Sequence, residues 1–416
     1  MVIQRKKYLD MLVEGIGNGL VKIVTGIRRS GKSFLLFNIF YNYLIENGVE
    51  ENHIIKISFD DLRSKKLRNP EMLLDYIETL IQTDKKTHYI ILDEIQLVEN
   101  FVEVLLSLMH NPLFDVYVSG SNSKFLSKDV VTEFRGRGDE IHVWPLSFAE
   151  FYSAVGGDKT EVWKEYYTYG GLPQIIEFKT EEKKISYLKN LYELTYLKDV
   201  IERNHLRNTE DFEKVVQVLS SAIGSPTNPK RISDTFKSVQ GTSVSDKTIQ
   251  NYISYLKDAF IIEESLRYDV KGRKYIGTEK KYYFSDVGLR AVILNFRQQE
   301  ESHIMENIVY NELRMRGYNV DVGFVENWTT NNEGKSVRQG LEVDFVINKG
   351  SERIYIQSAF KMPSEEKLAQ EERPLLRIND NFKKIIITGD DIKKKINEKG
   401  IITIGLLDFL LNDDIL

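Results

Sequence analysis

The stretch GIRRSGKS, Gly26 to Ser33, fits the pattern G-x-x-x-x-G-K-[ST] at every fixed position. A loop of this kind turns successive backbone N–H groups onto a phosphate chain, while its lysine reaches the β- and γ-phosphates and its hydroxyl binds Mg²⁺. Lys32 and Ser33 hold those two positions. The alternative is a basic turn that contains glycine and binds nothing. We therefore predict a nucleotide site, with contacts from Gly26, Ile27, Arg28, Arg29, Ser30, Gly31, Lys32, Ser33 and Phe34.

A second chemical signal is YIILDE, in which four apolar residues are followed by Asp93 and Glu94. Sheets with alternating strands and helices bind ligands at the carboxyl ends of their strands, where this pair would lie. Asp93 would hold Mg²⁺, and Glu94 would orient and deprotonate the water that attacks the γ-phosphate. Taken alone, an apolar run ending in Asp-Glu is as often a strand that leads into a loop. Because it follows the phosphate loop within the same predicted sheet, it indicates a catalytic pair.

Polar and basic side chains follow the next predicted strand. Ser121 or Asn122, within SGSNS, could touch the γ-phosphate or the attacking water, although small polar residues after a strand are also ordinary turn residues. Arg135 and Arg137 flank a glycine, and either could supply a cation to the γ-phosphate of a neighbouring subunit. A loop arginine is as often merely solvated. An arginine finger acting in trans would require a homo-oligomer.

The elements around these residues are those needed to position them. Residues 21–25, VKIVT, predict a buried strand, and FLLFNIFYNYLIEN predicts a helix that ends at Gly48. Further strands are predicted at 53–61 and 88–94 and within 115–123 and 140–144, with helices at PEMLLDYIETLIQ and NFVEVLLSLMHN. Strands that alternate with helices indicate an α/β fold, with a mostly parallel sheet and helices on both faces.

Length and composition limit the class of protein. With 416 residues the chain is too long for one ordinary core, so two or three domains are expected. A net charge of −5 argues against binding nucleic acid over the whole surface. The absence of cysteine excludes disulfides, thiolate zinc sites and cysteine nucleophiles. No apolar run is long enough to span a bilayer or typical of a secretory segment, so we expect a cytoplasmic protein with no membrane partner.

Five motifs in order resemble those of the prokaryotic, archaeal-ATPase-like AAA-type P-loop ATPases whose C-terminal half is a nuclease-like domain of unknown function. They are GIRRSGKS, ILDEIQ, VSGSNS, GRG followed by WPLSFAEF, and YGGLP. The motifs lie between residues 26 and 173, and the resemblance extends over nearly the whole chain. The resemblance implies ATP as the nucleotide, Mg²⁺ as the cofactor, and an AAA+-like sheet. In that sheet, strand 115–119 would lie between the phosphate-loop strand and the ILDE strand. It also implies a helical lid, and KISYLKNLYELTYLKDVIERN has the helical periodicity that a lid requires.

Residues 226–290 are predicted to form a winged-helix module. Ser245 is predicted to cap a helix with one apolar stripe and one open face, followed by strand FIIEESLRYDV, a turn at KGRK and a returning strand YYFSD. Residues 228–281 contain 11 Lys and Arg against 7 Asp and Glu, which favours duplex DNA as a partner. The predicted DNA contacts are Lys247, Gln250, Asn251, Arg273 and Lys274. A winged helix used only for packing between domains is the alternative.

The last part of the chain resembles restriction-type nucleases, in which a helical Glu, a strand Asp and a Glu-x-Lys on the next strand converge on a metal. The corresponding residues here are Glu306, Glu342, Asp344 and Gln357. The lysine of Glu-x-Lys is replaced by Ala359, which cannot activate water, and Lys361 would lie on the same strand face as a migrated substitute. We expect a degenerate domain that does not cleave nucleic acid; the alternative is that these carboxylates are only solvated surface.

The predicted fold is thus α/β, with a P-loop AAA+ ATPase core over 1–145, a helical lid over 146–225, a winged-helix module over 226–290 and a restriction-nuclease-like domain over 291–416. The predicted function is Mg²⁺-dependent ATP binding and hydrolysis by a DNA-associated switch. An ATP-gated nuclease, or a signalling or scaffolding ATPase that does not touch nucleic acid, are the alternatives. The catalytic candidates are Lys32, Glu94, Arg137, Ser121 and Asn122, and the Mg²⁺ ligands are Ser33 and Asp93.

Overall fold

A computed structural model describes residues 2–121, 134, 136–240, 243–277, 279–297, 300–330 and 336–416, with the backbone alone for 239–240, 327–330 and 336–339. The chain divides into two compact units. The first comprises Met1–Pro145 with Asp258–Phe260, and the second comprises Leu146–Lys257 with Ile261–Leu416. Each unit is described by itself. No helix among the described residues is both long and apolar enough to cross a membrane.

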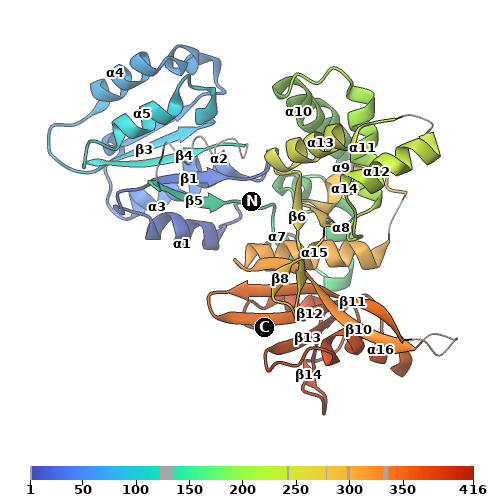
Figure 1. Cartoon of the computed structure of the whole chain (residues 1–416). Coiled ribbons are helices and arrows are strands. Elements are labelled where there is room, and N and C mark those ends of the chain that lie inside the picture. The colour runs from blue at the N-terminus through green and yellow to red at the C-terminus, as the bar shows by residue number, and fades with distance from the viewer. Residues whose placement is uncertain are drawn as a thin grey trace. The chain divides into compact units, whose positions relative to one another are not determined.

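The first unit is built on a parallel sheet with the strand order β2-β3-β4-β1-β5 (Figure 1). Its strands are β1 (Val21–Thr25), β2 (Ile54–Ser58), β3 (His88–Asp93), β4 (Phe114–Ser119) and β5 (Gly138–His142). Every pairing in it is parallel. The prediction that the strand at 115–119 lies between the phosphate-loop strand and the ILDE strand is confirmed. Because all strands point the same way, the residues after β1, β3 and β4 meet at one edge of the sheet.

Helices cover both faces of this sheet, as the alternating pattern predicted (Figure 1). On one face Ile90 and Val116 lie in a cluster with residues of α4 and α5. On the other face Ile91 and Tyr117 lie in a cluster with residues of α1 and α3. Strands buried on both faces need apolar residues at consecutive positions, which is why they read as continuous apolar runs. The helices are α1 (Lys6–Glu14), α2 (Lys32–Phe34), α3 (Tyr41–Glu46), α4 (Pro70–Leu80) and α5 (Phe101–Leu108), with a π-helical segment at Leu35–Phe40.

The second unit begins with a helical part. The helix predicted over KISYLKNLYELTYLKDVIERN is confirmed, as α9, a π-helical segment and α10 in succession. The elements of this part are α7 (Phe148–Val155), α8 (Lys159–Tyr169), α9 (Glu181–Leu191), the π-helical segment Tyr192–Leu197, α10 (Lys198–Arg203) and α11 (Thr209–Ser221). A capping box at Ser147 and Glu150 fixes the start of α7, directly after the apolar WPL.

The YGGLP motif is fixed by a buried carboxylate from a distant part of the chain. Asp286 accepts hydrogen bonds from the N–H of Gly171 (2.7 Å) and from the N–H of Leu289, at the start of α14 (Val287–Ile293) (3.1 Å). Gly170 has a φ of 78°, and a Cβ there would lie 2.2 Å from a carboxylate oxygen of Asp286. Gly170 is therefore required by the close approach of Asp286. Gly171 is required by the carbonyl oxygen of Leu146, which would lie 2.4 Å from a Cβ there, so both glycines have a structural explanation.

Two helices and a two-stranded antiparallel sheet follow. They are α12 (Pro229–Thr235), α13 (Asp246–Asp258), β6 (Ile262–Ser265) and β9 (Lys281–Phe284). Ser245 caps α13 as predicted, since its Oγ accepts a hydrogen bond from the N–H of Thr248 (3.1 Å). The predicted ribbon differs at its far end. There β7 (Arg267–Asp269) and β8 (Lys274–Tyr275) form a separate hairpin around KGRK, and β7 pairs in parallel with β10 of the next sheet.

The C-terminal part is a mixed sheet in the order β14-β15-β13-β12-β11-β10-β7-β8. Strands β10, β11 and β12 are antiparallel neighbours, whereas β12, β13 and β15 are parallel. The elements are α15 (Glu301–Met315), β10 (Asn319–Thr330), β11 (Ser336–Lys349), β12 (Glu352–Ala359), α16 (Glu365–Leu376), β13 (Lys383–Thr388), β14 (Lys395–Ile396), β15 (Ile402–Gly405) and α17 (Leu406–Leu411).

Candidate functional site

The loop GIRRSGKS joins β1 to α2 in a tightly turned backbone. Gly26 has a φ of 135°, and a Cβ there would lie 2.2 Å from the carbonyl oxygen of Val143. Gly31 has a φ of 99°, and Arg29 between them is also left-handed, with a φ of 67°. Only glycine adopts the first two conformations without strain. The backbone can therefore curve around a ligand, with the N–H groups at the start of the following helix left open for anions.

Lys32 points back into this loop. Its ammonium donates hydrogen bonds to the carbonyl oxygens of Gly26 (2.9 Å) and Ile27 (3.1 Å), and the side chain is buried. Burial lowers the pKa of Lys32 to about 8, although the carboxylates of Glu94 and Asp93 act in the opposite direction. The ammonium thus lies inside the loop. There the negatively charged oxygens of a phosphate chain would be stronger hydrogen-bond acceptors than the carbonyl groups.

Asp93, the last residue of β3, is surrounded by hydroxyl groups. Ser33 Oγ donates to its Oδ1 at 3.1 Å, Ser58 Oγ donates to its Oδ2 at 3.4 Å, and Ser119 Oγ also donates to Oδ1. Burial raises the pKa of Asp93, and the hydrogen bonds from Ser119 and Ser33 oppose this effect. The structure therefore brings the loop hydroxyl and this carboxylate together, as a shared Mg²⁺ site requires.

Glu94 is held in a left-handed conformation, with a φ of 55°. Its N–H donates to Ser119 Oγ (3.2 Å), and its carboxylate accepts hydrogen bonds from Ser121 Oγ (3.2 Å) and from the amide of Gln96. A non-glycine residue in this conformation costs about 1–3 kcal/mol and persists where neighbouring contacts fix it. Glu94 and Ser121 are thus brought together at the edge where Lys32 also lies.

The structure does not bring every predicted residue to this edge. The carbonyl of Arg137 accepts a hydrogen bond from the N–H of Val21, the first residue of β1 (3.0 Å), so Arg137 lies at the amino end of the sheet. The phosphate loop follows the carboxyl end of β1, so Arg137 cannot reach the phosphate site of its own chain. Phe34 is 43% exposed beside Ser33. Asn122 and Arg135 lie outside the described residues.

Two serines at this site were not among the predicted contacts, whereas the basic run that contains Arg5 suggested a place near the nucleotide. Ser58 and Ser119 end β2 and β4, on either side of β3. Arg5, which precedes α1, donates to the carbonyl oxygens of Trp144 (2.6 Å) and Ser30 (3.5 Å) and so supports the loop from behind. A small polar residue at the end of each strand was the available signal for the serines. The only signal for Arg5 was the basic composition of the first residues.

These observations fit a nucleotide with Mg²⁺. A Cβ at position 26 would fill the turn around Gly26. Among the described residues Lys32 donates to carbonyl oxygens alone, and Ser33 and Asp93 supply the oxygen ligands that Mg²⁺ prefers. Ser30 Oγ is buried in the loop without a hydrogen-bond partner among the described residues. Phosphate oxygens could accept from both the ammonium and this hydroxyl.

The second unit contains a cluster of the predicted carboxylates. Glu306 of α15 and Glu342 and Asp344 of β11 surround the ammonium of Lys281, the first residue of β9, at 2.9, 2.7 and 3.8 Å. Burial by itself would lower the pKa of Lys281, but the negative charges of Glu306, Asp344 and Glu342 together raise it well above its usual value. Burial and then the charge of Glu306 raise the pKa of Asp344. The carboxylates therefore converge around a lysine that the sequence did not point to.

Gln357 and Lys361 do not take the roles considered for them. The side-chain carbonyl of Gln357 accepts a hydrogen bond from the N–H of Asp344 (3.1 Å), and its amide donates toward Glu371 (3.4 Å). The suggestion that strand alternation brings Lys361 to the face of Gln357 and Ala359 is wrong, because β12 ends at Ala359. Lys361 is exposed, with its ammonium 5.4 Å from the ring centre of Phe360.

The predicted DNA contacts lie on two separate elements. Lys247, Gln250 and Asn251 are exposed on α13, whereas Arg273 and Lys274 are exposed at the β7–β8 hairpin, on the edge of the eight-stranded sheet (Figure 1). The prediction that the KGRK turn joins the two strands of the β6–β9 ribbon is wrong. Because β7 pairs with β10, this turn belongs to a separate hairpin.

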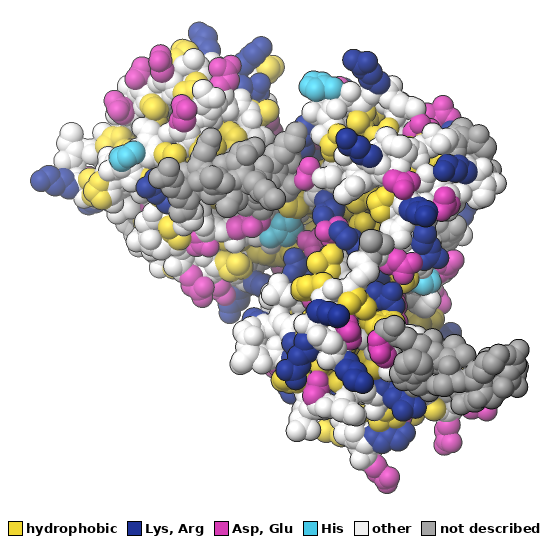
Figure 2. Space-filling model, viewed as in Figure 1, with side chains coloured by type: hydrophobic (Ala, Val, Ile, Leu, Met, Phe, Trp, Pro, Cys, Tyr) yellow, Lys and Arg dark blue, Asp and Glu magenta, His cyan; other side chains and the backbone are white. Residues whose placement is uncertain are grey.

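Some of the basic residues counted in this region are paired. Lys257 and Lys280 both bind the carboxylate of Glu264, at 2.6 and 3.0 Å, and Arg231 binds Glu279 at 3.2 Å. On the face seen in Figure 2, basic and acidic side chains are interspersed. These pairs leave the local net charge as counted, because Glu264 and Glu279 are among the seven acidic residues, but they engage three of the eleven basic side chains within the chain.

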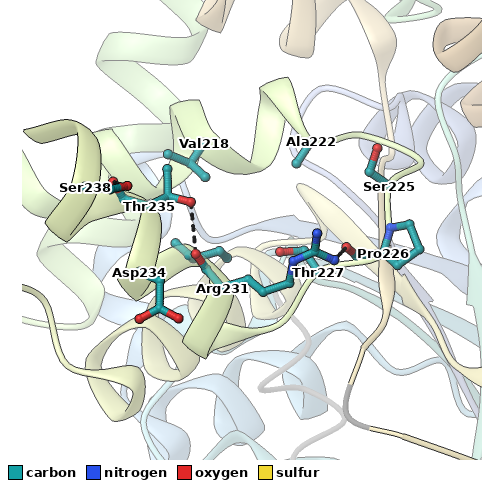
Figure 3. A pocket seen from close by; sticks show the side chains of 10 residues that line it. Val218, Ala222, Ser225, Pro226, Thr227, Arg231, Asp234, Thr235 and Ser238 are labelled. Atoms are coloured by element: carbon teal, nitrogen blue, oxygen red, sulfur yellow. Dashed lines mark hydrogen bonds between the residues drawn. The ribbon is translucent and has the colours of Figure 1, made fainter.

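A pocket of 510 Å³ lies elsewhere in the second unit, between α11 and α12 (Figure 3). The guanidinium of Arg231 crosses it and donates to the carbonyl oxygen of Pro226 (2.8 Å), while Thr235 Oγ1 donates to the carbonyl oxygen of Arg231 (2.9 Å). Its lining is Val218, Ala222, Ser225, Pro226, Thr227, Arg231, Ile232, Asp234, Thr235 and Ser238. It contains none of the predicted site residues.

The fold and the loop geometry define an AAA-type P-loop ATPase, and comparison with known proteins agrees. Residues 18–152 match the family described as AAA domain, and residues 160–300 match a domain of unknown function, DUF8612. The Walker-type ATPase PABY2304 of Pyrococcus abyssi superimposes with a TM-score of 0.52 at 16% identity, over 70% of this chain and 96% of that one. At this identity the likeness shows the fold alone.

Two relatives match most of the chain. A Haemophilus influenzae protein described as uncharacterized is 31% identical over 415 residues, which is 99% of both chains. The uncharacterized protein MJ1544 of Methanocaldococcus jannaschii is 30% identical over 363 residues, 83% of this chain and 76% of that one. The chain belongs to the same family as these two proteins, a family with an AAA domain in its N-terminal part.

Proposed function

We propose that this protein hydrolyses ATP with Mg²⁺ at the phosphate loop. The observation that carries the proposal is the meeting of Lys32, Ser33, Asp93 and Glu94 at one edge of the parallel sheet, where Ser33 Oγ lies 3.1 Å from Asp93 Oδ1. Membership of an AAA-domain family supports it. The subdivision of the second unit into lid, winged-helix module and nuclease-like domain is part of the same proposal.

The chain's own residues would do the following. Lys32 exchanges the carbonyls of Gly26 and Ile27 for the β- and γ-phosphate oxygens, and the loop N–H groups bind the same phosphates. Ser33 and Asp93 would hold Mg²⁺, which neutralises phosphate charge when it is bound. The hydroxyl of Ser119 keeps the carboxylate of Asp93 oriented toward Ser33, whereas that of Ser58 donates at shorter distance to Asp60 (2.6 Å).

Glu94 is the proposed base. It accepts a proton from the attacking water, and its position is fixed from the backbone by Ser119 and at the carboxylate by Ser121 and Gln96. Arg137, at the opposite end of the sheet, can act as an arginine finger only toward a neighbouring subunit. We therefore include a homo-oligomer in the proposal.

Phosphate release from ATP by the purified full chain, measured with Mg²⁺ and then with EDTA, tests this proposal. Turnover that requires Mg²⁺ and saturates with ATP supports it. A full chain that binds ATP and does not turn it over, with Mg²⁺ and at every protein concentration tested, would contradict hydrolysis while leaving nucleotide binding intact.

We predict that ATP affinity falls at alkaline pH. Lys32 has a lowered pKa of about 8 in the free protein, so it is charged below pH 8 and neutral above it. ATP favours the charged form, so binding above pH 8 takes up a proton and the affinity falls by up to tenfold per pH unit. Calorimetry at pH 9 in two buffers of different ionisation enthalpy should report an uptake approaching one proton, and at pH 7 almost none. An affinity unchanged between pH 7 and 9.5 would contradict this assignment.

We also propose that α12, α13 and the β6–β9 ribbon form a winged-helix module that binds duplex DNA, which makes the protein a DNA-associated switch. The support is the row of exposed polar side chains on α13, with Lys247, Gln250 and Asn251 on one open face. Phosphate contacts from such a face would make binding weaken steeply with added salt.

Because the structure separates α13 from the KGRK hairpin, each set should be tested by its own variant. We expect Lys247→Glu to weaken binding of a duplex by about tenfold at low salt, measured by fluorescence polarisation with and without ATP. Arg273→Glu with Lys274→Glu should have an effect only if the hairpin also meets phosphates. Lys183→Glu, at an exposed lysine of α9, is the matched control for charge. Wild-type protein without measurable affinity at low salt would leave this module as a packing element.

The second candidate is an ATPase that acts through protein partners and does not touch nucleic acid. The pairing of Lys257, Lys280 and Arg231 with Glu264 and Glu279 favours it, because these bases are neutralised within the chain. The same polarisation experiment separates the two candidates.

A further inference from the structure

Lys281 lies where the three predicted carboxylates converge. It is the first residue of β9, it is only 2% exposed, and its Nζ lies 2.9 Å from Glu306 Oε1 and 2.7 Å from Glu342 Oε1. Asp344 Oδ1 completes the arrangement at 3.8 Å. These carboxylates come from one helix and one strand that are adjacent to β9 in space but separate from it in sequence.

Two nearly buried carboxylates beside a third, that of Glu342, which is 35% exposed, need a cation, because like charges at short distance repel one another and the buried ones lose their hydration. Side chains of Glu306 and Asp344 are 11% and 13% exposed. In a metal-dependent nuclease a divalent ion supplies that charge. Here the ammonium of Lys281 lies at hydrogen-bonding distance from two of the three carboxylates. A metal ion bound to the same carboxylates would therefore be repelled by this positive charge.

Two further groups of the protein donate to this cluster. Tyr283, two residues further along β9, donates to Glu306 Oε1 at 2.7 Å. The N–H of Ser358 donates to Asp344 Oδ2 at 2.8 Å. Gly224 closes the other side of Glu306, since a Cβ there would lie 3.1 Å from Oε2. Lys281 and these two donors therefore already contact all three carboxylates, and the residues do not fit a metal site as they stand.

We infer that Lys281 is the permanent cation of this cluster: its ammonium takes the position that a divalent metal holds in a restriction-type nuclease. The wild-type domain then binds no metal here, and the ion pairs hold β9 against α15 and β11 instead. The inference rests on the proposed nuclease-like fold for its comparison with a metal site, and it does not depend on ATP hydrolysis. Its consequence is that this part of the chain serves for assembly or binding rather than cleavage.

Binding of Mn²⁺ to the full chain without nucleotide, followed by calorimetry and by loss of the free-ion EPR signal, tests the inference. The variants are wild type, Lys281→Met, and Lys281→Met combined with either Glu306→Gln or Asp344→Asn. Methionine keeps most of the lysine stem and removes its charge. We expect no Mn²⁺ at this cluster in the wild type and one Mn²⁺ per chain in Lys281→Met, at least 100-fold tighter. Either second substitution should abolish that binding.

Two outcomes would overturn the inference. One is wild-type protein that binds one Mn²⁺ per chain and loses it in Glu306→Gln. The other is a folded Lys281→Met protein that binds no Mn²⁺. Should Lys281→Met fail to fold, the wild-type comparison with Glu306→Gln still decides the question in either direction. Because nucleotide is absent throughout, failure here is distinguishable from failure of the proposed ATPase activity.

Discussion

Glu94→Gln is expected to bind ATP with nearly wild-type affinity and to lose turnover by about a hundred- to ten-thousand-fold. Glutamine has the same shape as glutamate and can still accept a hydrogen bond from Ser121, so the site should keep its structure. The N–H of residue 94, which donates to Ser119 Oγ, is unchanged by the substitution. Only the ability to accept the proton of the attacking water is removed.

Phosphate release at saturating ATP and Mg²⁺ gives the loss in kcat, and titration of a fluorescent ATP analogue gives the affinity. Glu99→Gln is the matched control, because Glu99 is exposed and follows in the same loop. A Glu94→Gln protein with wild-type kcat would show that another group is the base. A loss of affinity as large as the loss of kcat would instead indicate that Glu94 organises the site.

The strands and helices of the first unit could be predicted because the sequence signals that mark each of them are local. A β-branched run, a glycine loop and an apolar helix follow one another at β1 and α2, and each strand ends close to where its apolar run ends. The order of the strands required the family resemblance, since neighbours such as β1 and β4 are 90 or so residues apart in the chain and nothing local pairs them.

The residues that were missed are those whose role depends on a partner across the fold. Ser119 contacts Asp93 and the N–H of Glu94 only because β4 lies beside β3. Lys280 and Lys281 look alike in the sequence, yet alternate strand positions point to opposite faces. Lys280 therefore binds the partly exposed Glu264, while Lys281 is buried with Glu306. Which of two adjacent lysines is buried depends on the register of β9.

The β7–β8 hairpin illustrates the same limit. The turn at KGRK was predicted correctly from its residues, because Gly272 and its neighbours favour a tight reversal. The strand that pairs with β7, just before this turn, was not predicted correctly. The sequence alone does not distinguish between the returning strand β9 and the distant strand β10. The structure divides the segment, so that β6 pairs with β9 and β7 pairs with β10.

Lys32→Ala is expected to abolish measurable ATP binding, and hydrolysis with it. Lys32 is buried in the loop, and its ammonium has carbonyl acceptors from Gly26 and Ile27 that phosphate oxygens would replace. A hydrogen bond to a charged group contributes about 1.5–3 kcal/mol. Losing such bonds to two phosphates weakens binding by roughly a hundredfold or more, since 1.4 kcal/mol is tenfold.

Equilibrium titration of the fluorescent ATP analogue measures this loss, with circular dichroism to show that the variant is folded. Lys65→Ala is the matched control, because Lys65 is an exposed lysine of the same unit outside the loop. A folded Lys32→Ala protein with wild-type affinity would show that the loop binds no phosphate chain, and the proposed ATP site would have to be abandoned.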